Sequence, residues 1–199
     1  MVANASSRSI CVFCGSSAGN DPALLLSAET LGRTLVSRGY GLVYGGASIG
    51  LMGRVADTVL GAGGRVIGVM PDFLATKEIA HRCLTELKIT RSMHERKDTM
   101  ASLADGFIAL PGGFGTLEEF FEVLTWAQIG LHAKPCGLLN VNGYYDSLLR
   151  FLDTAIERGL LRAENRELIL VASEPNSLLD QMEAYAAPAL TKWIDTTRT

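Results

Sequence analysis

A glycine-rich turn followed by a cluster of glutamates is the segment of this sequence with the clearest chemical character. Residues Pro111–Thr116 read P-G-G-F-G-T, and Glu118, Glu119 and Glu122 follow closely. Glycine lets backbone N–H groups approach an anion, and a helix that begins at the turn adds its positive end. A carboxylate near a bound sugar can orient water or stabilise positive charge at the anomeric carbon. The segment therefore predicts a phosphate site with an acidic group beside it.

The same residues admit a purely structural interpretation. Thr116 and Glu119 have the T-x-x-E spacing of a capping box, in which the threonine caps a helix and the glutamate bonds back to it. Glu118 and Glu122 share one face of such a helix. This segment holds more glutamates than one cap needs, so both interpretations stay open here.

A second glycine-rich turn, Gly45–Gly50, follows the apolar run Gly41–Tyr44. Neither turn continues as a Walker A loop, G-x-x-x-x-G-K-[ST]. Gly113–Gly115 begins the dinucleotide fingerprint G-x-G-x-x-G, but Glu118 stands where its last glycine belongs. A mononucleotide therefore fits the pattern better than a dinucleotide, although glycine at strand-to-helix turns also serves structure alone.

Two cations and two cysteines require an explanation. Arg96 and Lys97 stand near the start of a predicted helix, Met93–Ala104, where they oppose the helix dipole. Because cations are unfavourable at a helix start, their presence there indicates a functional role. The alternative interpretation is that both side chains lie on a solvated surface. Cys11 and Cys14 form a C-x-x-C on an apolar run, which predicts buried structural thiols. The three histidines lack metal-ligand spacing, so the sequence predicts no metal.

Apolar runs that alternate with amphipathic stretches predict the elements that position these residues. The predicted strands are Ser9–Phe13, Gly41–Tyr44, Arg65–Met70, Leu84–Thr90, Gly106–Leu110, Pro135–Asn140 and Leu168–Val171. The predicted helices are Pro22–Arg38, Leu51–Leu60, Met93–Ala104, Leu117–Ile129, Tyr144–Arg158 and a last helix that Ser177 caps and that ends near Ala186. We expect an irregular excursion over Phe73–Cys83.

This order predicts a single-domain, Rossmann-like α/β fold: a doubly wound, mostly parallel sheet with helices on both faces. We expect one domain over residues 1–199, with flexible tails at 1–8 and 188–199. In such folds ligands bind at the carboxyl ends of the strands, which points to the loops Gly15–Asn20, Gly45–Gly50 and Pro111–Thr116.

The composition narrows the range of partners. The chain has 199 residues, 48% of them hydrophobic, and a net charge of −3, which disfavours a general nucleic-acid binder. The first nine residues contain no apolar run long enough for a signal peptide, and no stretch is long enough for a membrane span. We therefore expect a cytoplasmic protein with a small-molecule ligand and neither nucleic acid nor membrane as a partner.

Two blocks of this sequence resemble the signatures of the Lonely Guy family of phosphoribohydrolases, which cleave cytokinin riboside 5′-monophosphates. Pro111–Glu119 matches P-G-G-x-G-T-x-x-E, with Phe114 at the variable position, and Met93–Lys97 matches M-x-x-R-K. Cys14–Ser17 and Tyr44–Gly46 also look like family segments. The resemblance covers residues 10–171.

The resemblance implies an enzyme that releases a free base and ribose 5-phosphate from N6-modified AMP, works as a homodimer or larger assembly and uses no cofactor. It implies that Arg96 and Glu119 form the catalytic pair. The substrate-binding residues that it and the glycine turns indicate are Ser16, Gly45, Gly46, Glu78, Met93, Lys97, Gly112, Gly113, Phe114, Gly115, Thr116, Leu117, Glu118 and Thr125. The label "lysine decarboxylase" that many relatives carry requires pyridoxal phosphate, for which no lysine here shows a context.

Two other functions stay open at this stage. A non-catalytic nucleotide carrier could share the fold, because a fold does not fix a function. A nucleosidase acting on plain AMP or another purine nucleotide would need the same residues but a different base pocket.

The helix after Thr116 carries three aromatic side chains, Phe120, Phe121 and Trp126. They fit either a dimer interface or ordinary core packing.

Overall fold

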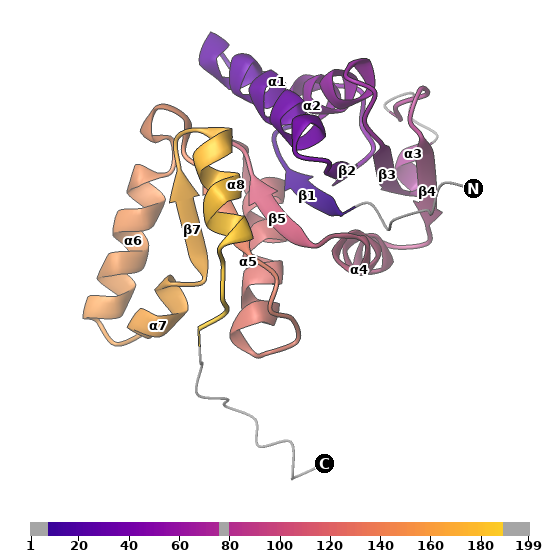
Figure 1. Cartoon of the computed structure of the whole chain (residues 1–199). Coiled ribbons are helices and arrows are strands. Elements are labelled where there is room, and N and C mark those ends of the chain that lie inside the picture. Colours follow the sequence, from indigo (N-terminus) through magenta and orange to yellow (C-terminus); the bar gives the residue numbers. More distant parts are fainter. Residues whose placement is uncertain (1–7, 76–79, 189–199) are drawn as a thin grey trace.

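The computed structural model describes residues 8–75 and 80–188, which form one seven-stranded sheet flanked by helices (Figure 1). All its strand pairs are parallel, in the order β4-β3-β2-β1-β5-β6-β7. The strands are β1 Ser9–Phe13, β2 Gly41–Tyr44, β3 Val66–Pro71, β4 Glu86–Thr90, β5 Gly106–Ala109, β6 Cys136–Leu139 and β7 Ile169–Ala172. The predicted doubly wound α/β fold is thereby confirmed.

The helices cover both faces of this sheet, because each central strand is apolar on both sides. They are α1 Pro22–Ser37, α2 Gly50–Gly61, α3 Asp72–Ala75, α4 Met93–Leu103, α5 Phe114–Gln128, α6 Asp146–Glu157, α7 Ala163–Arg166 and α8 Pro175–Glu183, with a 3-10 turn η1 at Val141–Gly143. In β1, Ile10 and Val12 join a core cluster with α1, α2 and α8. Cys11 and Phe13 face the opposite cluster, which contains side chains of α4, α5 and α6.

The strand order reverses at β1, which pairs with β2 on one side and with β5 on the other. The chain therefore leaves β1 and β5 toward opposite faces, and their carboxyl ends open a crevice. Gly15 N–H donates to the Pro111 carbonyl at 3.2 Å, which joins the two loops at this point. The phosphate-type turn predicted after β5 thus lies beside the loop that follows β1.

Several predicted boundaries were wrong. Helix α5 begins at Phe114, three residues before the predicted start, and α8 begins at Pro175, so Ser177 lies inside that helix instead of capping it. Part of the segment expected to be irregular forms α3. Helix α7 and the 3-10 turn η1 were not predicted from the sequence.

Other sequence predictions concern burial and the chain ends. Cys11 and Cys14 are buried free thiols, as predicted, and burial raises the pKa of both. Within residues 8–75 and 80–188, none of the helices is long and apolar enough to cross a membrane. The predicted tails lie outside the described residues, apart from Arg8 and Pro188, and so does Glu78.

Candidate active site

A cavity of about 520 Å³ lies above the carboxyl ends of the central strands. This volume is within the range of small-molecule sites, ~300–1,000 Å³. Its wall includes the loops after β1 and β2, the end of β3 and the first turns of α4 and α5: Cys14, Gly15, Ser16, Gly45, Ala47, Ile49, Met52, Met70, Leu74, Met93, Arg96, Gly113, Phe114, Gly115, Thr116, Glu118 and Glu119. The cavity therefore occupies the place that the fold reserves for a ligand.

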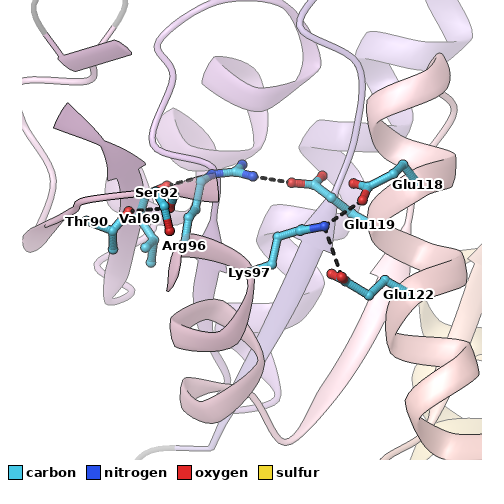
Figure 2. Close-up of polar contacts among 8 residues, drawn as sticks. All are labelled: Val69, Thr90, Ser92, Arg96, Lys97, Glu118, Glu119 and Glu122. Atoms are coloured by element: carbon cyan, nitrogen blue, oxygen red, sulfur yellow. Dashed lines mark hydrogen bonds and ion pairs between the residues drawn. The ribbon is translucent and has the colours of Figure 1, made fainter. Parts of the chain in front are cut away.

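Arg96 is buried, with 7% of its surface exposed, and lies in the second turn of α4. Its Nε donates to the Val69 carbonyl of β3 at 3.1 Å, and its Nη1 donates to Oε1 of Glu119 (Figure 2). Nη2 lies against Gly45, where a Cβ would overlap it. Gly45 therefore makes room for the guanidinium at the cavity wall, and Arg96 spans from the sheet to α5.

Glu119 projects from α5 toward this guanidinium, and its side chain is 13% exposed. Burial raises the pKa of its carboxyl above the usual value, although the positive charges of Arg96 and Lys97 oppose the shift. The capping-box interpretation of Thr116 and Glu119 is wrong. Because α5 begins at Phe114, Thr116 already lies inside the helix, and Glu119 points to Arg96 instead of back to a cap.

The N-cap residue of α5 is Gly113, and no side chain of residues 8–75 or 80–188 caps this helix. A helix of this kind leaves its first N–H groups without intrahelical partners, and they carry the positive end of the dipole. A Cβ at Gly113 or Gly115 would meet nothing within 4 Å, so open space lies in front of the turn. Gly112 differs, because a Cβ there would overlap the side chain of the buried Thr116. The arrangement can accept an anion at Gly113–Thr116.

Lys97 points toward α5 (Figure 2) and is not among the residues that line the cavity. Its Nζ donates to Oε1 of Glu118 at 2.5 Å and to Oε1 of Glu122 at 3.0 Å, and the lysine side chain is 11% exposed. Burial lowers the pKa of this lysine, but the two carboxylates outweigh it and the net shift is upward. The second carboxylate oxygen of Glu122 is buried without a hydrogen-bond partner among the described residues. Lys97 therefore ties α4 to α5 beside the Arg96–Glu119 pair.

The structure brings most of the predicted site residues together. Those in the cavity wall are Ser16, Gly45, Met93, Arg96, Gly113, Phe114, Gly115, Thr116, Glu118 and Glu119. Those outside it are Gly46, Lys97, Gly112, Leu117 and Thr125. Thr125 is exposed, and its hydroxyl donates to the Phe121 carbonyl of its own helix at 2.7 Å. It follows Glu118 by about two turns, or ~10 Å along α5, which carries it past the cavity.

Met93 and Phe114 were predicted from the sequence, but the rest of the apolar wall was not. Ile49, Met52, Met70 and Leu74 line it, and Ile49, Phe114 and Met93 remain substantially exposed at 44%, 95% and 39%. These residue types carry no chemical signal of their own. Two clues to position were available: Met70 stands at the carboxyl end of a predicted parallel strand, and Ile49 stands in the predicted ligand loop Gly45–Gly50.

Comparisons with known proteins identify the family of this chain. A protein-family model described as "Possible lysine decarboxylase" matches residues 52–182. A cytokinin riboside 5′-monophosphate phosphoribohydrolase of Arabidopsis thaliana is 52% identical over 89% of this chain and 84% of its own length. A probable enzyme of the same name from Oryza sativa is 50% identical over 91% of this chain and 74% of its own length. The chain belongs to the Lonely Guy family.

More distant structures share the fold of this Lonely Guy protein. A molybdenum cofactor binding protein of Rippkaea orientalis superposes with a TM-score of 0.67 and 22% identity, over 89% of this chain and 96% of the other. The molybdenum cofactor carrier protein of Chlamydomonas reinhardtii gives a TM-score of 0.66 at 22% identity, over 90% and 99%. At this identity the likeness shows the fold alone and says nothing about the site.

Proposed function

We propose that this chain hydrolyses the N-glycosidic bond of N6-modified adenosine 5′-monophosphates and releases the free base, a cytokinin, and ribose 5-phosphate. The observation that carries the proposal is the buried Arg96–Glu119 pair, which faces the same cavity as the uncapped N-terminus of α5. The identity of about half to the phosphoribohydrolases of Arabidopsis and rice supports the same reaction.

The 5′-phosphate binds at Gly113–Thr116, where free N–H groups and the helix dipole favour a negative charge. Cleavage of the bond between C1′ and the base leaves positive charge on the ribose. Glu119 stabilises that charge and positions the attacking water, whose oxygen ends on C1′ while the base leaves with a proton. Burial strengthens this electrostatic effect, because little solvent screens the carboxylate.

Arg96 has two tasks in this scheme. Its bonds to the Val69 carbonyl and to Glu119 hold the carboxylate at the cavity wall. Its Nη2, beside Gly45, lies where it can donate to an oxygen of the ribose or phosphate. The exposed apolar side chains at the cavity mouth, Ile49, Met93 and Phe114, give the purine and its substituent an apolar surface.

The proposed setting is a homodimer in the cytoplasm, with a small nucleotide as the substrate. The family resemblance and the exposed apolar residues after α5, Ile129 at 42% and Leu131 at 69%, support the dimer. Phe120 and Leu124 contribute to the core instead, since both are buried. Light scattering coupled to size-exclusion chromatography measures the molar mass and tests the dimer.

The activity is tested by incubating the purified protein with N6-isopentenyl-AMP, AMP and N6-isopentenyladenosine, and measuring the free base by chromatography. We expect release from the modified monophosphate and much slower release from the nucleoside, which lacks the phosphate that anchors at α5. Equal release from AMP would indicate a general nucleotide nucleosidase. Nucleotide binding without release from any of the three would identify a carrier and contradict the proposal.

A further inference from the structure

A second cavity, of about 400 Å³, adjoins the active-site cavity. Gly15, Ser16 and Gly113 line both, so the two cavities share one wall at the phosphate turn. The second cavity lies where the strand order reverses, between the loops that follow β1 and β5. Open α/β sheets bind ligands at this crevice, yet hydrolysis of a nucleoside monophosphate in the first cavity makes no use of it.

The far wall of the second cavity is firmly built. Tyr144 lines it, and the tyrosine hydroxyl donates to the Gly112 carbonyl at 2.8 Å. The Tyr144 ring packs edge-on against Tyr145 with 5.0 Å between centroids, and the buried Tyr145 hydroxyl donates to the Leu110 carbonyl at 2.6 Å. Tyr144 nevertheless remains 49% exposed. It is a fixed aromatic surface that a ligand can still contact.

The chemistry of the two cavities differs. The first contains Arg96 and Glu119, whereas none of the described residues that line the second is acidic or basic. The second offers hydroxyl and amide groups of Ser17 and Asn20 beside the aromatic ring of Tyr144. Without a cation it offers a second phosphate no charge-assisted hydrogen bond from a side chain. Neutral donors and acceptors next to an aromatic ring suit an uncharged, hydroxyl-bearing group.

The wall shared by the two cavities determines how a group in the second cavity would be attached to the substrate. Gly113 is the N-cap of α5, the point at which the proposed function places the 5′-phosphate, and open space lies in front of its Cα. A phosphate bound there has the nucleoside in the first cavity and the second cavity on its other side. We propose that the second cavity binds a neutral sugar or polyol esterified to the 5′-phosphate, so that the chain also accepts nucleoside 5′-phosphodiesters.

This inference rests on the proposed function, and the glycosidic step is unchanged. Water oxygen bonds to C1′, the bond between C1′ and the base breaks, and the base leaves with the proton. The second product is ribose 5-phosphate that still carries its ester.

The test compares kcat and KM for N6-isopentenyl-AMP, its 5′-phosphoglycerol diester and its 5′-diphosphate. Two variants fill the second cavity from exposed loop positions, Asn20→Trp and Ser17→Trp, and Leu26→Trp is the control on the exposed face of α1 outside that cavity. Thermal melting verifies that each variant is folded.

We expect the wild-type KM for the diester to lie within about threefold of that for the monoester, and the KM for the diphosphate to be at least about tenfold higher. Each blocking variant should raise the KM for the diester about tenfold or more and change that for the monoester less than about twofold. Cleavage of the monoester without the diester, equal effects of the variants on both, or a diphosphate as good as the diester would overturn the inference. Failure to cleave even the monoester would overturn the proposed function and this inference with it.

Discussion

The N-termini of α4 and α5 share one sequence pattern and use it in opposite ways. Ser92 and Glu95 form a cap at α4: the Ser92 hydroxyl accepts from Glu95 N–H at 3.1 Å, and the Glu95 carboxylate accepts from Arg91 N–H at 2.8 Å. Thr116 and Glu119 have the same spacing, but α5 has started earlier, at a glycine N-cap without a side-chain bond. The Ser92 side chain caps α4, whereas no side chain among the described residues caps α5.

The difference shows that the residues before the Ser/Thr-x-x-Glu pattern determine whether it forms a helix cap. At α4 the serine stands at the N-cap in extended geometry, and Thr90 supports the turn by donating to the Ser92 carbonyl. At α5 the glycines of the turn take the chain into the helix before Thr116 is reached. Glu119 is thereby released from capping and becomes available to Arg96. The same four-residue pattern thus produces a structural cap in one helix and a candidate catalytic carboxylate in the other.

The largest contrast is expected between the two glutamates. Glu119→Gln should lower kcat by ~10²–10³, because it removes the charge that stabilises the ribosyl cation. Glu95→Gln, the matched change at the capped helix, should leave kcat within about twofold of wild type. Release of base from N6-isopentenyl-AMP measures both. If Glu119→Gln keeps wild-type kcat, the carboxylate has no catalytic role.

A cap introduced at α5 should remove the distinction between the helices. Gly113→Asp places a carboxylate at the N-cap, where the glycine backbone leaves space for a side chain. It should raise the KM for the monophosphate by roughly 10–100-fold, because like charges oppose each other at the phosphate site. Gly113→Ser, which is neutral, should have a smaller effect. Equal KM values for Gly113→Asp and wild type would place the phosphate elsewhere.

Removal of the cap at α4 should act on stability. Ser92→Ala deletes the acceptor for Glu95 N–H and should lower the free energy of unfolding by about 1 kcal/mol. Urea denaturation followed by circular dichroism measures the change. Ser102→Ala, at an exposed position near the other end of α4, serves as the control. A loss of substrate affinity without a loss of stability would mean that Ser92 belongs to the site.

The smallest expected effect concerns Lys97, whose side chain links α4 to α5. Its positive charge opposes the rise in the pKa of Glu119 that burial causes. Because the proposed mechanism needs Glu119 as a carboxylate, we expect activity to be lost as the pH falls through its pKa. Lys97→Met should raise that pKa and move the acidic limb of the kcat profile to higher pH.

The control for this shift is Lys88→Met, which removes a lysine that pairs with Glu86 on the edge strand. A pH profile of that variant should match wild type. If the acidic limb of the kcat profile of Lys97→Met stays at the wild-type pH, Lys97 does not influence the pKa of Glu119.

Much of the fold followed from local patterns. Gly41–Tyr44 was predicted with its observed boundaries, because an apolar run between glycines leaves few alternatives. Helix starts were harder to locate. Ser177 has the residue type of a cap, but Glu174 and Pro175 begin that helix, since proline at the first position costs no hydrogen bond. At α5 the glycines hid the helix start, because their low helix propensity masks the first turn.

The site was predictable in part, and the reason is spatial. The glycine turn and the family signature singled out Arg96, Glu119 and Gly113–Thr116, and the structure brings these residues into one cavity wall. The partners of Lys97 could not be read from the chain, because Glu118 and Glu122 lie on another helix and meet it only after folding. Met52 and Leu74 gave no signal, since apolar side chains in a cavity wall look like core residues in a sequence.

The anchoring of Arg96 has a consequence for the cost of binding. A long arginine side chain carries roughly 2 kcal/mol of rotamer entropy when it is free. Here the Val69 carbonyl, Glu119 and the missing side chain of Gly45 have already confined it. The protein loses this rotamer entropy during folding. The binding of a nucleotide therefore carries no further entropy cost for immobilising the Arg96 side chain.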